Sequence, residues 1–108
     1  MSAELYEAIY TLVRQIPRGN VSTYGAISKV LAINPRVVGY ALHRNPSAEK
    51  TPCHRVVFKD GQLSPGYVFG GEDVQRAQLK KEGICFSKKG KVIDKYFWEN
   101  TFNDGILS

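Results

Sequence analysis

Two short helical patterns separated by a tight turn place the strongest constraint on how this chain folds. One spans residues 23–31 and the other residues 35–44. Asn34 suits the N-cap of the second helix, and Pro35 suits its first position because the first helical turn leaves its amide hydrogens unpaired. Two helices this close predict a helix-turn-helix unit, which many DNA-binding proteins use and other small helical domains also contain.

A longer amphipathic helix precedes this pair, and short extended segments follow it. Apolar side chains recur every three or four residues across 5–16, which predicts one buried helical face. Residues 55–58 predict a short strand, 72–82 a helix with acidic residues first and lysines last, and 84–86 with 91–93 a hairpin. We therefore expect a mainly α fold with small β elements, arranged as a winged helix-turn-helix-like DNA-binding domain.

Length and composition indicate one globular domain over residues 1–108. Apolar residues make up 43% of the chain and charged residues 23%, which is ordinary for a packed domain. The net charge of +5 favours nucleic acid or an anionic surface as the partner. No apolar run is long enough for a membrane span, and the N-terminus lacks a signal-peptide pattern. We expect a cytoplasmic protein with no membrane partner, or a nuclear one in a eukaryote.

The two cysteines, Cys53 and Cys85, are too few for a disulfide framework. No Cys or His pair has the spacing of a zinc site, so we expect no metal. Cys85 lies in an apolar strand pattern, which predicts that it is buried.

Cys53, in contrast, is followed directly by His54 and Arg55. A neighbouring cation, or an imidazole acting as base through a shared water, favours the thiolate, which is the nucleophilic form of cysteine. The same three residues also fit a small buried side chain, a hydrogen-bonded loop histidine and a surface charge. Chemistry alone leaves both interpretations open, because a lone Cys-His pair transfers poorly between families.

Five motifs, taken in order, make the chain resemble the DNA-binding, catalytic domain of the O6-alkylguanine-DNA alkyltransferases, also called methylated-DNA–protein-cysteine methyltransferases. They are VSTYGAIS at 21–28, RVVGYALHRNP at 36–46, PCHRVV at 52–57, GYVFGG at 66–71 and Lys81-Glu82-Gly83. The matching region covers more than half of the chain. The resemblance implies no cofactor, and it implies a domain without the family's N-terminal domain or any zinc site there.

The activity that this resemblance implies is self-inactivating DNA repair. Cys53 matches the residue that takes the alkyl group from guanine O6 and keeps it as a thioether. His54 matches the base that deprotonates Cys53 through water, and Glu82 matches the carboxylate that orients His54, which is the logic of a catalytic triad. Asn45 matches the hinge residue that ties a helix end to the active-site loop.

Extrusion of the base is required because the O6 carbon of a stacked guanine cannot reach a buried thiol. Arg36 matches the finger that fills the gap in the base stack, and Tyr24 matches the tyrosine that helps to rotate the nucleotide at its phosphate. Gly39 fits the close approach of a helix to the minor groove, whereas Tyr40 is bulkier than is common on that face. The implied partner is double-stranded DNA containing O6-alkylguanine, bound by a monomer.

The implied pocket for the extruded base is formed by Pro52, Val56, Tyr67, Val68 and Phe69. Val68 and Phe69 stand where many family members carry a tyrosine and a small polar residue, and the tyrosine is displaced by one position to Tyr67. The loop that carries them is slightly longer than in some members. These departures affect the size of the pocket and the stacking on the flipped base.

A second interpretation keeps the fold but not the reaction. Alkyltransferase-like proteins bind the lesion and flag it for nucleotide excision repair proteins, and they commonly carry tryptophan in place of the cysteine, so Cys53 favours the enzyme. A helix-turn-helix regulator is a third class. It would explain Arg36 and the net charge, but not Asn45, the Cys53-His54 pair and Glu82 together.

Overall fold

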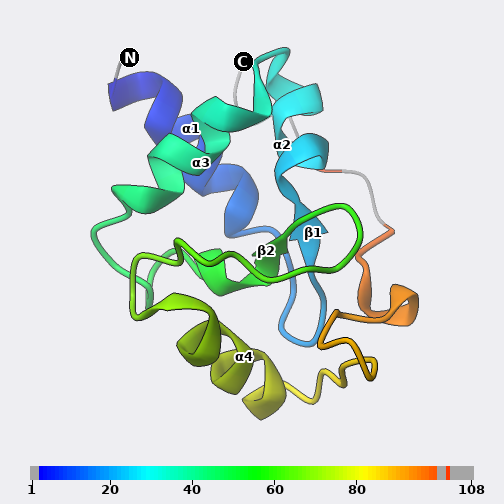
Figure 1. Cartoon of the computed structure of the whole chain (residues 1–108). Coiled ribbons are helices and arrows are strands. Elements are labelled where there is room, and N and C mark those ends of the chain that lie inside the picture. Colours follow the sequence, from blue (N-terminus) through cyan, green and yellow to red (C-terminus); the bar gives the residue numbers. More distant parts are fainter. Residues whose placement is uncertain (1–2, 100–101, 103–108) are drawn as a thin grey trace.

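The computed structural model describes residues 3–99 and residue 102. Across these residues it has four α-helices, two short strands and two 3₁₀ turns, so the predicted mainly α fold with small β elements is confirmed. In chain order they are α1 (Ala3–Val13), β1 (Ser22–Thr23), α2 (Tyr24–Leu31), α3 (Pro35–His43), η1 (Cys53–Arg55), β2 (Val56–Val57), α4 (Gly71–Lys81) and η2 (Asp94–Tyr96). Figure 1 shows α1, α2 and α3 grouped at one end of the molecule and α4 at the other, with the strands between them.

The helices α2 and α3 form the predicted helix-turn-helix unit. The Thr23 hydroxyl accepts a hydrogen bond from the Ala26 amide (3.0 Å), and the Asn34 side chain accepts one from the Arg36 amide (2.9 Å). Each bond satisfies an amide that the first turn of a helix leaves unpaired. Ala32 takes a left-handed backbone conformation (φ 55°) after α2, which ends that helix and allows the chain to reverse.

The first helix packs against α3 through its apolar face. The Tyr10 hydroxyl donates to the Ala41 carbonyl (2.6 Å), and this bond is buried. The helix ends at Val13, before the predicted Ile16, because the next residues tighten into turns in which the Ile16 amide donates to the Val13 carbonyl (3.1 Å). Ile16 is nevertheless fully buried, as its place in the apolar pattern predicts.

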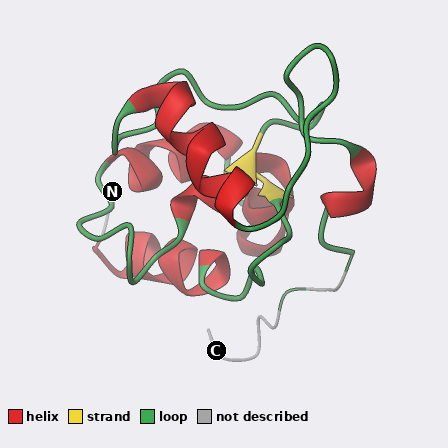
Figure 2. Cartoon of the chain, turned by 90° about the horizontal axis from the view of Figure 1, so that it is seen from below, coloured by secondary structure: helices red, strands yellow, loops and turns green. Residues whose placement is uncertain are grey.

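The two strands pair in parallel, with Ser22 opposite Val56. The predicted strand 55–58 is shorter in the structure, because Arg55 belongs to the η1 turn and the Phe58 amide is bonded within the turn that follows (3.0 Å). Figure 2 shows this small sheet surrounded by helices. Because the pairing is parallel, the η1 turn lies at the end of the sheet where β1 begins, and the loop that follows β2 lies beside the start of α2, where Phe58 meets Tyr24.

The hairpin predicted at 84–86 and 91–93 is wrong in extent. One antiparallel bridge joins Phe86 to Val92, and no named strand forms in the described part of this segment. The Ser87 amide donates to the Lys91 carbonyl (2.8 Å) beside this bridge, and the outward-facing Val92 amide donates to the Gly61 carbonyl (2.9 Å), so the second half of the hairpin also pairs with a distant loop.

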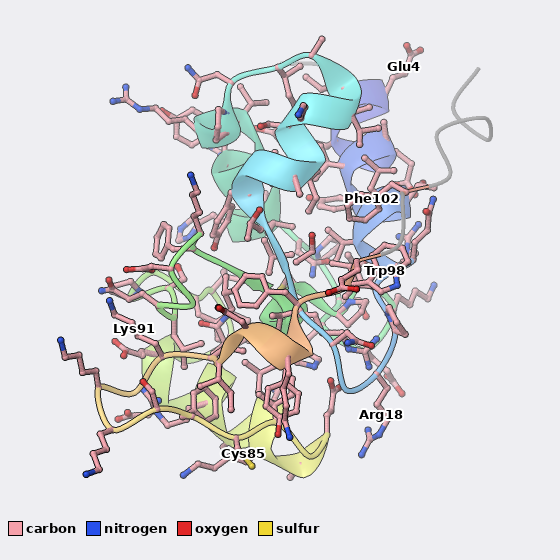
Figure 3. The ribbon with its side chains drawn as sticks, turned by 90° about the vertical axis from the view of Figure 1, so that its right-hand side faces the viewer. Glu4, Arg18, Cys85, Lys91, Trp98 and Phe102 are labelled. Atoms are coloured by element: carbon pink, nitrogen blue, oxygen red, sulfur yellow. The ribbon has the colours of Figure 1, made fainter. Side chains whose placement is uncertain are left out.

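The prediction that Cys85 is buried is also wrong, because its side chain is exposed (Figure 3). Successive side chains of an extended segment point to opposite sides, so Ile84 and Phe86 pack against the core while Cys85 between them faces solvent. On the same view, Trp98 lies beside Phe102, with 4.9 Å between the ring centroids.

Candidate active site

Cys53 lies in the wall of a pocket of about 680 Å³ between the helix-turn-helix unit and the loop that follows β2. Its side chain is only 3% exposed. Six of the residues that the sequence assigns to the site line the same pocket, namely Tyr24, Arg36, Gly39, Tyr40, Tyr67 and Val68. The structure therefore brings the proposed nucleophile and most of the proposed DNA-contacting and pocket residues to one surface.

Three of the predicted pocket residues do not line this cavity. Val56 is fully buried in the core. Pro52 is half-buried just before the η1 turn, Cys53–Arg55, which is called the reactive turn because it holds the proposed nucleophile. Phe69 packs its ring edge-on against Tyr67, with 5.9 Å between centroids. Phe69 therefore packs against a residue of the pocket wall.

An aromatic residue that the sequence reasoning missed takes part in the pocket instead. Phe58 lines the cavity, is 42% exposed and stacks its ring 5.2 Å from that of Tyr24. Tyr40, Phe58 and Val68 are three of the four exposed large apolar side chains of the described residues, and all three line the pocket. Such a gathering of exposed apolar surface is typical of a binding site.

His54 and Glu82 meet across 28 residues of sequence. The Nε2 atom of His54 lies 2.8 Å from Oε2 of Glu82, and both side chains are more than nine-tenths buried. Glu82 is the C-cap residue of α4, so the end of that helix delivers the carboxylate to the reactive turn. A carboxylate only accepts hydrogen bonds, so Nε2 carries the proton of a neutral His54 and Nδ1 carries the lone pair.

Arg55 binds the same carboxylate. Its Nε and Nη2 atoms donate to Glu82 at 3.0 and 2.8 Å, and its Nη1 donates to the Ile16 carbonyl at 2.9 Å. The contacts of Arg55 are therefore with the Glu82 carboxylate and a backbone carbonyl, and they do not bear out the expectation of a cation beside the thiol. This bidentate geometry is among the stronger hydrogen-bonding arrangements in proteins.

Burial and hydrogen bonding act in opposite directions on the pKa of His54 and on that of Glu82, and both pKa values are lowered overall. Burial lowers the pKa of His54 and outweighs the hydrogen bond that His54 donates to Glu82 and the negative charge of Glu82, which both act to raise it. For Glu82, burial acts to raise the pKa, but hydrogen bonds from Arg55 and His54 outweigh it and lower the pKa overall. The arrangement therefore favours a charged Glu82 beside a neutral His54, whose Nδ1 is buried and makes no hydrogen bond within residues 3–99 and 102.

The environment of Cys53 in the free protein favours the protonated thiol over the thiolate. Burial raises the pKa of Cys53, while hydrogen bonds with Asn45 and Tyr67 act to lower it. Burial and the neighbouring Cys53 also raise the pKa of Tyr67, so its hydroxyl keeps its proton. Proton removal from Cys53 thus needs a base within reach.

Asn45 lies between the end of α3 and the η1 turn. It is buried, its Nδ2 donates to the Thr51 carbonyl (2.9 Å), and its Oδ1 accepts from the Ser47 amide (3.1 Å). Both bonds fold the connecting loop back on itself, and the hinge role stays a prediction.

A second residue missed by sequence reasoning is Gln75 on α4, which is fully buried. Its Nε2 donates to the carbonyls of His54 and Val56, both at 3.1 Å, and its Oε1 accepts from the Ser64 amide at 2.9 Å. Gln75 therefore joins the reactive turn to the loop that follows β2, which contains Ser64, lines the pocket and is called the pocket loop. The available signal was its position four residues before Leu79, on the buried face of the helix.

Neither a cluster of metal ligands nor a helix able to span a membrane is present among the described residues. Among residues 3–99 and 102, no three His, Cys, Asp or Glu side chains lie together as metal ligands would. No helix in the same region is long and apolar enough to cross a membrane.

Comparisons with known proteins agree with this architecture. Residues 4–84 match the family described as 6-O-methylguanine DNA methyltransferase, DNA binding domain. A methylated-DNA--protein-cysteine methyltransferase from Methanosarcina acetivorans is 41% identical over 76% of this chain and 53% of its own length. A DNA base-flipping protein from Vibrio parahaemolyticus is 38% identical over 84% of this chain and 92% of its own length.

The structural comparison points to the same group. S. pombe Atl1, solved in complex with damaged DNA containing O6-carboxymethylguanine, is 30% identical with a TM-score of 0.78, covering 93% of this chain and 99% of that chain. The first methyltransferase relatives are longer, and this chain spans 34–53% of their length. With the family matched over residues 4–84, this chain belongs to the 6-O-methylguanine DNA methyltransferase family.

Proposed function

We propose that this protein repairs O6-alkylguanine in double-stranded DNA by moving the alkyl group to Cys53. The observation that carries the proposal is that Cys53 lines the pocket while the next residue, His54, is hydrogen-bonded to Glu82 at 2.8 Å. In this proposal Cys53 in the pocket wall is the nucleophile, and the buried His54 and Glu82 next to it are the base and the carboxylate that orients the base.

The reaction would begin with removal of the Cys53 proton through a water to Nδ1 of His54. The sulfur then attacks the alkyl carbon, a carbon–sulfur bond forms, and the bond between that carbon and guanine O6 breaks. Its electron pair stays on the guanine, which takes up a proton and becomes the normal base. The thioether on Cys53 has no route back to a thiol, so each molecule reacts once.

Positioning of the base supports the same proposal. Arg36 is exposed at the start of α3 and lies at the pocket, where it could replace the extruded guanine in the stack. Tyr24 begins α2 and lines the same cavity, next to the aromatic ring of Phe58. Aromatic walls stabilise an unstacked base because every base has a face to stack upon.

A second candidate function is binding of the lesion without transfer. It is favoured by the buried environment of Cys53, which raises the pKa of the thiol and so keeps it protonated. The likeness to the S. pombe Atl1 complex over nearly the whole of both chains fits this function equally well. In that case the protein would present the lesion to nucleotide excision repair proteins.

The intact mass of the protein after incubation with a duplex containing O6-methylguanine separates the two functions. Transfer adds one methyl group, and peptide mapping should place it on Cys53. Cys85→Ala is the matched control, because Cys85 is an exposed thiol outside the pocket and its loss should leave the methyl uptake unchanged. Cys53→Ala should bind the lesion without taking up methyl. A wild-type protein that binds the lesion and gains no mass would establish the second function instead.

A further inference from the structure

The strongest feature that the proposed reaction leaves unassigned is the pair of arginines around Glu82. We propose that Arg55, assisted by Arg18, is a positioning residue that holds His54 as a neutral imidazole and so keeps it ready to accept the Cys53 proton. This inference rests on the proposed alkyl transfer.

The Glu82 carboxylate accepts hydrogen bonds from both His54 and Arg55. Its Oε2 atom accepts from His54 Nε2 and from Arg55 Nη2, both at 2.8 Å, while Oε1 accepts from Arg55 Nε at 3.0 Å. The Glu82 side chain is 5% exposed and that of Arg55 is 15% exposed. Water therefore screens this three-residue cluster only weakly.

Arg55 is held where it is by an additional bond. Its Nη1 donates to the Ile16 carbonyl (2.9 Å), which fixes the guanidinium against the turn that follows α1. The contact spans 39 residues of sequence and leaves the planar group little freedom to rotate away from Glu82.

Arg18 adds a second positive charge from the same turn region. Its Nη1 lies 4.0 Å from Glu82 Oε2, and its Nη2 donates to the Lys81 carbonyl at 2.9 Å. The side chain is 67% exposed, and Figure 3 shows it at the edge of the molecule. Its influence on the cluster must therefore be weaker than that of Arg55.

One negative and two positive side chains act on the protonation of His54. Glu82 reaches it from the end of α4, Arg18 from the segment between α1 and β1, and Arg55 and Cys53 belong to its own turn. A protonated His54 would be a third cation around a single buried carboxylate. Burial and the two arginines all lower the pKa of His54, and Glu82 alone acts to raise it.

Loss of Arg55 should shift this balance toward the protonated form of His54, although burial and Arg18 still oppose it. Glu82 would then be free to pair with an imidazolium, so His54 would take up a proton at a higher pH. A protonated His54 cannot accept the proton of Cys53, because its Nδ1 no longer has a lone pair. The variant should lose transfer activity at mildly acidic pH, where the wild-type protein still reacts.

Nuclear magnetic resonance titration of the His54 ring nitrogens, assigned with His54→Asn, measures this effect without DNA. Arg55→Met should raise the pKa of His54 by roughly one unit, because a like charge at this range has an effect of about that size. Arg18→Ala should raise it by less, and Arg55→Lys, which restores the charge, should return it toward the wild-type value. Lys80→Met is the matched control: it removes a positive charge from the exposed face of α4 and should leave the titration of His54 unchanged.

Single-turnover methyl transfer measured against pH gives the second readout. The acidic limb of the Arg55→Met profile should move to higher pH by the same amount as the His54 titration. At a pH one unit below the midpoint of that shifted limb, the rate should be roughly tenfold below its plateau. A merely structural role for Arg55 would lower the rate at every pH and leave the limb in place.

Two outcomes would overturn the inference. One is a His54 pKa that is unchanged in folded Arg55→Met, and the other is a His54 pKa that is lowered in Arg18→Ala. If Arg55→Met does not fold, the exposed Arg18 decides the matter, with Arg18→Glu expected to raise the His54 pKa further than Arg18→Ala. Failure of the proposed function is a separate result, because a wild-type protein that takes up no methyl still has a titrating His54.

Discussion

Asn45 and Cys53 donate hydrogen bonds to the same backbone carbonyl. Nδ2 of Asn45 lies 2.9 Å and the Cys53 amide nitrogen 2.7 Å from the oxygen of Thr51. Thr51 is almost fully buried, and its hydroxyl accepts a further bond from Arg14 Nε (3.1 Å). The end of α3 and the reactive turn are therefore fixed to each other through one buried residue.

Asn45→Asp should separate this bond from the others that Asn45 makes. An aspartate keeps an oxygen that can accept from the Ser47 amide, but it cannot donate to the Thr51 carbonyl. We expect a loss of about 1–3 kcal/mol in the free energy of unfolding, because a buried acceptor is left facing a carboxylate. Urea denaturation measures this, and single-turnover transfer should slow as the reactive turn moves. A variant equal to wild type in both measurements would show that the Thr51 contact does not hold the turn.

Gln75→Met tests the connection between the reactive turn and the pocket loop. Methionine has a similar volume but leaves the carbonyls of His54 and Val56 and the amide of Ser64 without their partner. Each buried group that stays unpaired costs roughly 1–3 kcal/mol, so the free energy of unfolding should fall strongly.

The matched control for that change is Gln78→Met, one turn further along α4. Gln78 is only partly buried, and its side chain accepts a single long bond from the Tyr67 hydroxyl (3.4 Å). Urea denaturation should therefore show a much smaller loss for Gln78→Met than for Gln75→Met. Equal losses would mean that the helix, and not the three buried bonds, determines the cost.

Local signals explain why the helical part of this fold is predictable from sequence. The caps at Thr23 and Asn34 act within three residues of themselves, and the structure forms both. Hydrophobic periodicity likewise places Ile16 in the core even though α1 ends earlier. Contacts with distant partners are harder to predict: Val92 forms a bridge with Phe86 within the expected hairpin, but no local pattern indicates that its amide also bonds to the Gly61 carbonyl.

The candidate site also depends on residues that lie far apart in the sequence, and these are the harder part to predict. Nothing local in the sequence relates Glu82 to His54, and only the resemblance to a known family joined them before the structure placed them 2.8 Å apart. Phe58 and Gln75 were missed because neither belongs to a chemical motif. Their roles arise from the pocket wall and from buried carbonyls that exist only after folding.

The pH dependence of stability should depend on Glu82. Hydrogen bonds from Arg55 and His54 lower the pKa of this carboxyl in the folded protein. The stability that this provides is present above the ordinary carboxyl pKa of about 4.3 and is lost as the pH falls through the lowered folded value. Glu82→Gln should therefore be much less stable than wild type at pH 7, and the difference should shrink at low pH.

Urea denaturation of both proteins at neutral and at acidic pH measures this change. Glu4→Gln, which removes a carboxylate exposed at the start of α1 (Figure 3), corrects for the altered net charge. A difference between wild type and Glu82→Gln that stays constant with pH would contradict the pairing of a charged Glu82 with Arg55 and His54.

Arg36 should matter for duplex DNA and not for the chemistry. If it fills the gap left by the extruded guanine, Arg36→Ala should slow repair within a duplex by roughly tenfold to a hundredfold, because unstacking a base costs a few kcal/mol. A free O6-alkylguanine base needs no extrusion, so its reaction with Cys53 should be nearly unaffected. His54→Asn should slow both substrates, since both need the thiolate.

Single-turnover rates on the two substrates make this distinction, with Arg44→Ala as the matched control at the other end of α3. Arg44 lies outside the cavity that contains Cys53, so its loss should weaken DNA binding at most and leave the rate at saturating DNA unchanged. Equal slowing of both substrates by Arg36→Ala would mean that Arg36 supports the pocket itself. The finger role would then be wrong, because a residue that acts only on the base stack cannot slow the reaction of a base that was never stacked.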